Sequence, residues 1–405
     1  MPWRETCAMK ERLRFVTLFE EGEETMVALC RRFGISRKTG YEVLARYAAQ
    51  GVDGLKEHSH AAHHHPHAVS EAIEQRVVAF RGEHPTWGPR KLKRELSNRH
   101  PTTHWPATST MGAILDRNGL IVPRRRRPVT PPDLVPFATC DGCNTHWSVD
   151  FKGWFRTADG RRCEPLTISD SFSRFLLRCQ AVRRADTRCV RPLLEATFRE
   201  YGLPRAIRSD NGPPFASRAL GGLSQLSIWW IKLGIRPERI TPGRPCENGR
   251  HERLHGTLKR DACQPPAANR RRQQQRFDSF RRIYNDERPH EALGYATPSS
   301  VYQPSPRPYP DRLPEIVYPD HWQVRRVRHN GEIRWRGELL FISELLSGEP
   351  VGLEEIEGGW RLLFGPLPLG DIDHAGRLHA NRDRRRRGAL RSLMAARAAP
   401  APTGT

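Results

Sequence analysis

Residues 205–260 constrain the fold of this chain more than any other stretch. They open with AIRSDNG, an apolar strand pattern that ends in Asp210 and an Asn-Gly turn. They close with PCENGRHERLHGTLKR, a loop that enters a helix with Glu252 near its start and Lys259 two turns later. Acids at a strand end and on a nearby helix suit a divalent cation, because hard cations take oxygen ligands. The stretch therefore predicts part of a metal site, which needs a third acid.

The third acid is Asp150, which lies within the extended run THWSVDFKGWF. An acid in the middle of an otherwise apolar strand is unusual, because a buried carboxylate without a partner is costly. The alternative is a structural acid in a salt bridge. Asp159, Asp170 and Asp186 compete with Asp150, but they lie at turns or at a helix start, where Asp commonly makes local hydrogen bonds. We therefore interpret those three as structural.

Residues 139–303 have the pattern of an α/β domain. After the strand with Asp150, RRCEPLTISDSFSRFLLRCQAV predicts two more strands, and TRCVRPLLEATFREYG predicts an amphipathic helix. RAIRSD then predicts a parallel strand. Three strands, a helix and a parallel strand begin an RNase H-like core, in which helices flank a mixed sheet.

Residues 1–55 predict an all-α helix-turn-helix DNA-binding domain. ETMVALCRRFG is a short helix that ends on a glycine, and ISRKTGYEVLARYAAQG is a second helix with Ser36 as its N-cap. The start of such a second helix contacts base edges and phosphates. The candidates for DNA binding there are Arg37, Lys38, Thr39 and Tyr41. The alternative is a plain helical hairpin.

Residues 69–122 predict three helices, of which the middle one, WGPRKLKRELSNRH, has a basic face. Arg90 and Lys91 on that face are further candidates for DNA binding. We interpret this segment as a second helix-turn-helix-like domain, with a dimerisation bundle as the alternative.

Low-complexity segments flank these helices. Residues 56–68 are a His-rich linker, and residues 123–138 are a basic, Pro-rich linker. An HHCC-like zinc site is the alternative for the first segment, made by His63, His67, Cys140 and Cys143. The spacing disfavours zinc, because a long, folded-looking segment separates the two pairs.

The C-terminal part predicts a small β domain. Residues 304–320 are a Pro-rich linker, and residues 321–378 alternate in the manner of short strands. WQVRRVRHNGEIRWRG predicts a hairpin around its Asn-Gly turn, and the regular strands that follow predict a small β-barrel. Residues 379–405 are basic and are predicted to be disordered.

Charge and hydropathy limit the function of the chain. Lys and Arg number 67 against 45 acids, a net charge of +22 over 405 residues, which favours nucleic acid as the partner. An Arg-rich soluble protein from a GC-rich genome is the alternative, and it leaves the size of the charge unexplained. No apolar run approaches the roughly 20 residues of a membrane helix. The charged N-terminus does not resemble a signal peptide, so the cytoplasm is the expected location and the cysteines are expected to be reduced.

Four segments, in this order, resemble the integrase catalytic core of insertion-sequence transposases: HWSVDFKGWF, IRSDNGPPF, PCENGRHERLHGTLKR and YNDERPHEALGYATP. Such transposases belong to the DDE recombinases, as do retroviral integrases. The resemblance implies a catalytic, metal-binding triad of Asp150, Asp210 and Glu252, with Glu247 left in the loop. Helix geometry also favours Glu252, because Lys259 at i+7 shares its face. The interval between the last two acids is longer than in retroviral integrases.

The resemblance further implies Mg²⁺, with Mn²⁺ as the alternative, and two-metal phosphoryl transfer. Such a transposase cuts DNA at the element's ends and transfers the 3′-OH into target DNA. Its partners would be double-stranded DNA, as terminal inverted repeats and target, and further copies of the chain in a homo-oligomer. Arg253 and Lys259 would contact phosphates, whereas His255 fits a packed helix histidine at least as well. Structural roles are expected for Arg288, Pro289 and His290.

Two other functions are compatible with the same motifs. One is a catalytically silent DNA-binding regulator that retains the fold, and the other is a plain metal-dependent nuclease. The intact set of three acids disfavours the first, and the two upstream DNA-reading segments disfavour the second.

Overall fold

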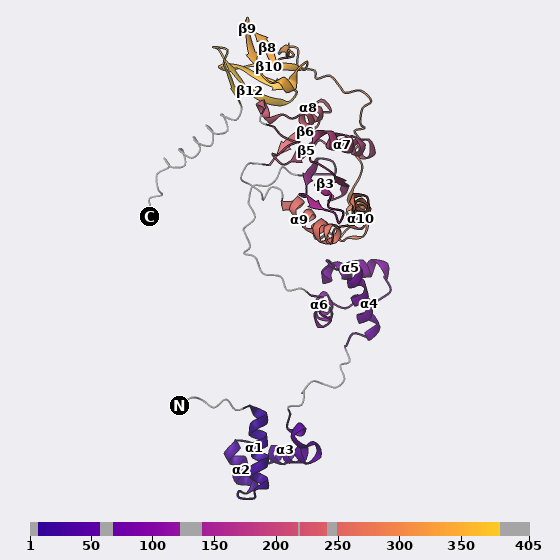
Figure 1. Cartoon of the computed structure of the whole chain (residues 1–405), viewed down its shortest axis with the longest axis vertical. Helices are drawn as coiled ribbons and strands as arrows, with labels where there is room; N and C mark the ends of the chain where they lie inside the picture. Colours follow the sequence, from indigo (N-terminus) through magenta and orange to yellow (C-terminus); the bar gives the residue numbers. More distant parts are fainter. Residues whose placement is uncertain (1–6, 57–67, 122–139, 218, 241–248, 381–405) are drawn as a thin grey trace, which may run out of the picture. The chain divides into compact units, whose positions relative to one another are not determined.

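The computed structural model describes residues 7–56, 68–121, 140–217, 219–240 and 249–380. The chain divides into two compact units, residues 1–69 and 70–405. Figure 1 labels the helices and strands.

The first unit contains α1 (Ala8–Glu20), α2 (Met26–Phe33), α3 (Arg37–Gln50) and the 3₁₀ turn η1 (Gly51–Leu55). Gly34, with φ of 64°, ends α2 in the left-handed conformation and turns the chain toward α3. The Ser36 side chain caps α3 by accepting a hydrogen bond of 3.1 Å from the Thr39 amide. The buried core of this unit includes Phe15, Leu29, Val43 and Leu55. α2 and α3 confirm the predicted helix-turn-helix.

The second unit begins with three helices, α4 (Glu71–Glu83), α5 (Pro89–Arg99) and α6 (Thr108–Arg117). Pro89 is the first residue of α5. Proline has no backbone N–H, and at this position an N–H would have no hydrogen-bond partner within the helix. The side chains buried between these helices include Trp87, Leu92, Met111 and Ile114. All three predicted helices of this segment are present.

The central sheet has six strands: β1 (His146–Phe151), β2 (Phe155–Arg156), β3 (Arg162–Asp170), β4 (Leu176–Val182), β5 (Ala206–Ser209) and β6 (Arg236–Arg239). The strand order is β2-β3-β1-β5-β6, and β4 pairs with β3. β3 is antiparallel to β1 and β4, whereas β5 is parallel to β1 and β6. The sheet is therefore mixed, as the sequence predicts.

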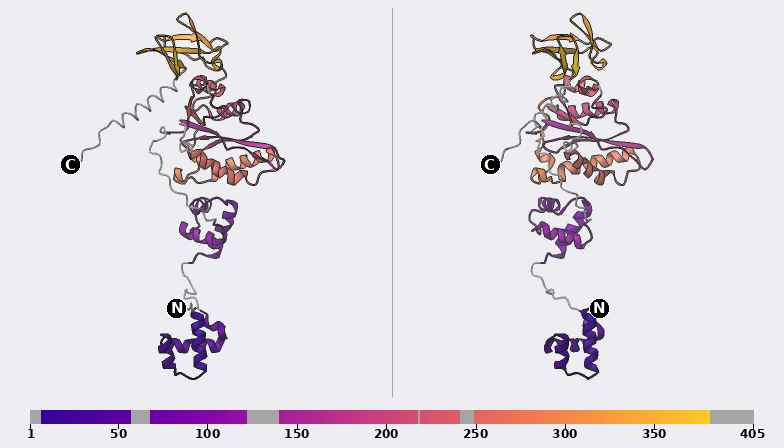
Figure 2. Two further views of the ribbon diagram at one scale, coloured as in Figure 1. Left: turned by 60° about the vertical axis from the view of Figure 1, so that its left-hand side comes forward. Right: turned by 90° about the vertical axis from the view of Figure 1, so that its left-hand side faces the viewer.

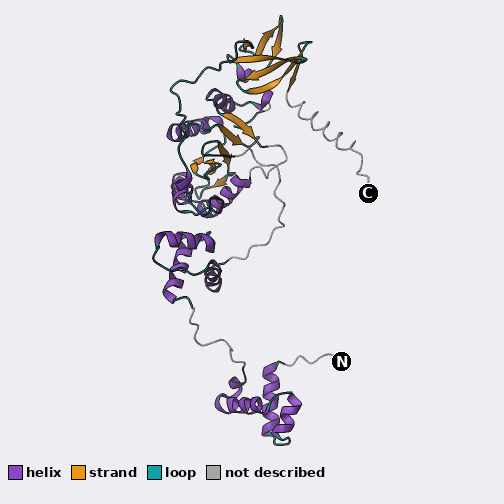
Figure 3. Ribbon diagram, turned by 180° about the vertical axis from the view of Figure 1, so that it is seen from behind, coloured by secondary structure: helices purple, strands orange, loops and turns teal. Residues whose placement is uncertain are grey.

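Helices cover both faces of this sheet (Figures 2 and 3). α7 (Thr187–Tyr201) and α8 (Gln225–Lys232) share one apolar core with Trp147 and Val149 of β1. α9 (Gly249–Leu258) and α10 (Arg270–Arg282) share another core with β3 and β4. Because side chains alternate along a strand, Asp150 faces α9 and not α7. Short helical segments follow these helices: the π-helical η4 (Lys259–Cys263) and η5 (Ile283–Glu287), the 3₁₀-helical η6 (Glu291–Leu293) and the α-helix α11 (Pro298–Val301).

The long segment between β5 and α9 contains η2 (Leu220–Gly222), α8 and β6. α8 carries apolar side chains on two sides, so it is buried on both. Leu226 and Trp230 join the core of the central sheet, whereas Ile228 and Ile231 join the core of the C-terminal strands. The segment between Asp210 and Glu252 thus contains a helix that packs against the C-terminal strands.

The C-terminal strands are β7 (Gln323–Arg326), β8 (Glu332–Trp335), β9 (Glu338–Phe341), β10 (Pro350–Ile356), β11 (Gly359–Phe364), β12 (Leu367–Asp373) and β13 (Leu378–Ala380), with the 3₁₀ turn η7 (Glu344–Leu346). They form a five-stranded sheet, β13-β12-β11-β10-β7, and a separate pair, β8-β9. Among the described residues the strands do not close into one ring, so the predicted small β-barrel is not confirmed.

The predicted hairpin around Asn330 is also corrected. The Asn330-Gly331 turn joins β7 to β8, but β7 pairs with β10 and β8 pairs with β9. The two-residue hairpin turn lies at Arg336-Gly337, where both φ angles are positive, 49° and 92°. That conformation matches the right-handed twist of the two strands it joins.

No helix within the described ranges is both long enough and apolar enough to cross a membrane.

Candidate active site

Asp150 lies near the carboxyl end of the central strand β1, on the face of the sheet that α9 covers. Its Oδ1 accepts a hydrogen bond of 2.7 Å from the Phe151 amide. Thr167 of β3 is its direct cross-strand partner. Since Trp147 and Val149 occupy the opposite face, the strand delivers one acid to the face that α9 covers.

Asp210 directly follows β5, the parallel neighbour of β1. Ser148 and Arg208 form the last register pair of the two strands, and Asp150 and Asp210 each lie two residues beyond that pair. The carboxyl ends of neighbouring parallel strands thus carry the first two predicted acids. Asp210 is half-buried, and its buried Oδ1 has no hydrogen-bond partner among the residues that the structure describes. Burial raises the pKa of its carboxyl group, because the charged form loses hydration.

Gly212 follows this acid at close range. A Cβ atom at residue 212 would lie 3.1 Å from Asp210 Oδ2. A side chain there would crowd the carboxylate, so the glycine leaves the acid accessible.

Glu252 lies in the first turn of α9, between two histidines that point inward. His251 and His255 are buried, and Glu252 is exposed. Since successive helix positions differ by about 100°, Glu252 lies on the flank of the face that the histidines turn toward the sheet. Glu247, left in the loop by the sequence, lies outside the described residues.

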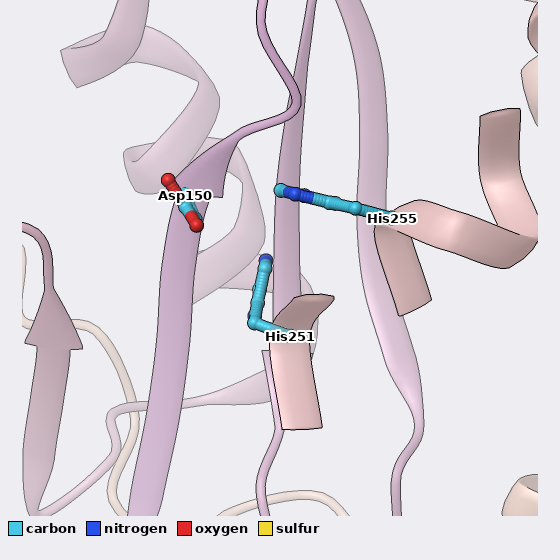
Figure 4. A group of neighbouring side chains, drawn as sticks. All are labelled: Asp150, His251 and His255. Carbon is cyan, nitrogen blue, oxygen red and sulfur yellow. The ribbon is translucent and has the colours of Figure 1, made fainter. Parts of the chain in front are cut away.

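One hydroxyl group binds both histidines. Thr167 Oγ1 lies 2.7 Å from His251 Nε2 and 2.8 Å from His255 Nε2. Burial lowers the pKa of His251 to about 4 and that of His255 to about 2, so both imidazoles are neutral at pH 7. Figure 4 shows both rings extending from α9 toward Asp150. The interpretation of His255 as a packed helix histidine agrees with this geometry.

His251 and Thr167 were not predicted from the sequence. The signal for the histidines is their spacing at i and i+4, which places both on one face of a helix. Thr167 gives no such signal, because its contact with α9 is made by tertiary packing.

Two sets of side chains could hold a cation at Asp150. Ligand atoms of Asp150, His251 and His255 all lie within 4.8 Å of one another, a set with two imidazoles that suits Zn²⁺. The predicted set of Asp150, Asp210 and Glu252 offers only oxygen atoms, which suit Mg²⁺ and Mn²⁺. The partnerless Oδ1 of Asp210 fits the oxygen set, whereas the imidazoles already bind Thr167.

The competing acids all accept hydrogen bonds, from nearby residues and, for Asp170, also from Asn144, 26 residues away. Asp170 Oδ1 accepts from the Asn144 amide at 2.8 Å, and its Oδ2 accepts from the Ser173 amide at 2.8 Å. Asp159 accepts from the Thr157 hydroxyl at 2.5 Å, and Asp186 caps α7. Each has the structural contacts that the sequence predicts for it.

The residues that follow α10 are buried against the core. Arg288 is buried and forms a 3.5 Å ion pair with Asp261 of η4. His290 is largely buried, and burial lowers its pKa to about 3. These contacts agree with structural roles.

The candidates for DNA binding differ in exposure. The four at the start of α3 are all exposed, namely Arg37, Lys38, Thr39 and Tyr41. Arg253 and Lys259 are also exposed, although Lys259 lies in η4 just after α9. Arg90 is exposed and pairs with Glu291 at 3.3 Å. Lys91 is half-buried, and burial lowers its pKa to about 8.

The structure shows only half of the alternative zinc site. Cys140 Sγ lies 3.6 Å from His146 Nδ1, and Cys143 Sγ donates to the Val301 carbonyl at 3.4 Å. His63 and His67 lie outside the described residues.

Comparison with solved structures aligns this chain with an integrase catalytic core domain and with a chain of an intasome, each over most of its own length. The HTLV-2 integrase catalytic core domain, in complex with magnesium, is 16% identical, with coverage of 40% of this chain and 99% of that chain and a TM-score of 0.31. The simian T-cell lymphotropic virus intasome, solved with PP2A regulatory subunit B56 gamma, is 16% identical, with coverage of 76% and 96% and a TM-score of 0.34.

Family models match the N-terminal helices and the central α/β domain. Residues 141–245 and 233–298 match the integrase core domain, residues 11–62 a helix-turn-helix domain, and residues 39–115 a homeodomain-like domain.

Relatives of known sequence extend the match. The insertion element IS476 uncharacterized 39.2 kDa protein of Xanthomonas euvesicatoria is 27% identical over 68% of this chain and 78% of its own length. The insertion element IS407 uncharacterized 31.7 kDa protein of Burkholderia multivorans is 29% identical over 58% of this chain and 82% of its own length. The Gag-Pol polyprotein of feline leukemia virus is 30% identical over 44% of this chain and 11% of the polyprotein. These matches show that the chain contains an integrase core domain and is similar to proteins of insertion elements.

Proposed function

We propose that the chain is a DNA transposase that cleaves DNA at the ends of its element and joins the 3′-OH to target DNA. Asp150, Asp210 and Glu252 are the catalytic residues, and they hold Mg²⁺ or Mn²⁺. The observation that carries the proposal is the placement of the first two acids on neighbouring strand ends, beside the helix that carries the third.

The residues of this site have distinct tasks. Asp150 lies on β1, which pairs with β5 ahead of Asp210, and its carboxylate is close to the α9 histidines on either side of Glu252, so it would share ligand duty with both acids. Divalent ions held by these carboxylates would stabilise the attacking and leaving oxygens of an in-line displacement. The exposed Arg253 and Lys259 supply positive charge for DNA phosphates near the acids.

Recognition of the element's ends is assigned to the N-terminal helices. The exposed start of α3 presents two cations, a hydroxyl and an aromatic ring, a set that can bind phosphates and base edges. Arg90 and Lys91 of α5 are assigned a secondary role, since Lys91 is half-buried and Arg90 already pairs with Glu291. Two ends must be held together, so we propose a homo-oligomer on DNA in the cytoplasm.

The proposed domain boundaries follow the sequence. They are 1–55 and 69–122 for the DNA-binding domains, 139–303 for the catalytic core and 321–378 for the C-terminal β domain. Linkers occupy 56–68, 123–138 and 304–320, and 379–405 form the tail.

A strand-transfer assay tests this function. Purified chain, Mg²⁺, labelled element ends and a plasmid target should give joined products. Asp150→Asn, Asp210→Asn and Glu252→Gln should each abolish joining, whereas Asp159→Asn, at an exposed turn of the same domain, should not. Joining that survives any of the three triad changes refutes the assignment. Cleavage without joining by the wild type would identify a nuclease, and DNA binding without either reaction would identify a silent regulator.

A further inference from the structure

The Thr167 hydroxyl connects three polar groups from two secondary-structure elements other than its own. Oγ1 lies 2.7 Å from His251 Nε2, 2.8 Å from His255 Nε2 and 3.2 Å from the carbonyl oxygen of Asp150. A hydroxyl has one proton to donate and two lone pairs to accept with. The carbonyl can only accept, so the Thr167 proton goes to Asp150. Both imidazoles must then donate from Nε2, and this is the one arrangement that satisfies all three contacts.

The three side chains are enclosed. Thr167 is 0% exposed, His251 3% and His255 9%. A buried polar group that loses its partner costs far more than an ordinary hydrogen bond contributes. α9 therefore cannot slide or tilt relative to β3 without leaving donors unpaired inside the core.

This linkage bears directly on the catalytic acids. Thr167 is the cross-strand partner of Asp150, and Glu252 is flanked on α9 by the two histidines that Thr167 binds. We propose that Thr167, His251 and His255, which we call the Thr167 cluster, are positioning residues that fix Glu252 relative to Asp150. The inference rests on the proposed function, because it concerns the same three acids.

The geometry favours positioning over direct binding of a cation by the imidazoles. A cation bound by both Nε2 atoms would lie about 2.0–2.1 Å from each of them. The Thr167 oxygen already occupies hydrogen-bond positions to both atoms, so it would have to move away or become a ligand itself. The Thr167 cluster satisfies itself without an ion.

The test compares three threonine variants of the full chain. Thr167→Val keeps the shape and removes the hydroxyl, and Thr167→Ser restores the hydroxyl. Thr197→Val is the matched control, because Thr197 is equally buried, on α7, and donates to the Leu193 carbonyl at 2.7 Å. The primary readout is Mn²⁺ binding in the presence of element-end DNA, followed by electron paramagnetic resonance, with thermal melting measured in parallel.

Loss of a group that orients metal ligands typically costs about 10–100-fold in metal affinity or activity. Thr167→Val should weaken Mn²⁺ binding and strand transfer by a factor in this range, and Thr167→Ser should restore both. Thr197→Val should lower the melting temperature and leave Mn²⁺ affinity unchanged. Wild-type affinity in Thr167→Val, or equal losses in both valine variants, would overturn the inference.

Nitrogen NMR of histidine-labelled chain supplies a readout that is independent of activity. His251→Gln and His255→Gln identify the two ring signals, and both rings should be neutral with the proton on Nε2. A proton on Nδ1 of either ring overturns the hydrogen-bond assignment. Binding of one Zn²⁺ that His251→Gln abolishes would show a metal site in place of a positioning cluster. If the wild type neither binds Mn²⁺ nor joins DNA, the proposed function fails. The NMR result would still show whether His251 and His255 donate hydrogen bonds to Thr167.

Discussion

Two carboxylates of the core should respond to neutralisation in opposite directions. Asp210 has a buried oxygen with no hydrogen-bond partner among the described residues, and burial raises the pKa of its carboxyl group. In Asp170, which is 1% exposed, both oxygens accept hydrogen bonds from backbone amides. Asp210→Asn should therefore stabilise the metal-free protein, and Asp170→Asn should destabilise it.

The magnitudes follow from the partners. A buried polar group without a partner costs about 1–3 kcal/mol, so removing the charge of Asp210 should recover part of that cost. Burial raises the pKa of Asp170 as well, but its replacement amide must turn its NH₂ group toward an N–H donor. Hydrogen bonds to charged groups contribute about 1.5–3 kcal/mol each, so Asp170→Asn should lose at least one such contribution. Each kcal/mol shifts the melting temperature by about 2–4 °C in a domain of 150–250 residues.

The pH dependence of stability gives the same sign for the effect of Asp210→Asn. Because the folded-state pKa of Asp210 is raised, the folded chain binds this proton more tightly than the unfolded chain. Stability of the wild type is therefore lost as pH rises from the unfolded-state pKa through the folded-state pKa. The advantage of Asp210→Asn should open over that window and stay constant above it.

Calorimetry with and without Mg²⁺ completes the experiment. A cation at 100 times its dissociation constant stabilises the folded state by about 2.7 kcal/mol. Mg²⁺ should raise the melting temperature of the wild type and of Asp170→Asn, but not that of Asp210→Asn. The reasoning is refuted if Asp210→Asn melts below the wild type without metal, or if Mg²⁺ still stabilises it.

Three further predictions concern other parts of the chain. Ile231→Ala should destabilise the C-terminal strands by about 2–5 kcal/mol in calorimetry. Leu226→Ala, on the other side of α8, should instead destabilise the central sheet. Identical effects of the two substitutions would contradict the two-sided packing of α8. Arg288→Met should leave Asp261 without its ion-pair partner at 3.5 Å and lower the free energy of unfolding in urea by up to about 3 kcal/mol. Adding Asp261→Leu in the same chain should largely restore that stability. A double variant as unstable as the single one would count against the ion pair. Lys38→Ala should weaken DNA binding across all sequences and lower the salt slope of the affinity by about 1 in fluorescence anisotropy, and an unchanged slope would exclude a phosphate contact.

The central sheet could be predicted because its pattern is local. Trp147, Val149 and Asp150 alternate along β1, so the apolar side chains and the acid necessarily face opposite sides. Asp210 follows a strand whose parallel pairing the sequence predicts, and the structure confirms that pairing. Local pattern and global fold agree at these positions, so the strand acids could be identified before the fold was known.

Contacts made only in the folded chain could not be predicted. Thr167 reaches His251 across 84 residues of sequence, and nothing around Thr167 marks it. The C-terminal strands alternate as a barrel would, but alternation does not say which strand pairs with which. Arg336-Gly337 supplies the tight turn, which leaves β8 and β9 as a separate pair beside the larger sheet.

The central claim is that Asp150, Asp210 and Glu252 bind metal ions as one site. The most direct measurement is anomalous X-ray scattering from crystals of the full chain with element-end DNA and Mn²⁺. The account predicts Mn²⁺ bound by Asp150 and Asp210 and a second ion bound by Asp150 and Glu252, with His251 and His255 still bonded to Thr167. Mn²⁺ coordinated by the two imidazoles, or a Glu252 carboxylate turned away from every ion, would contradict it.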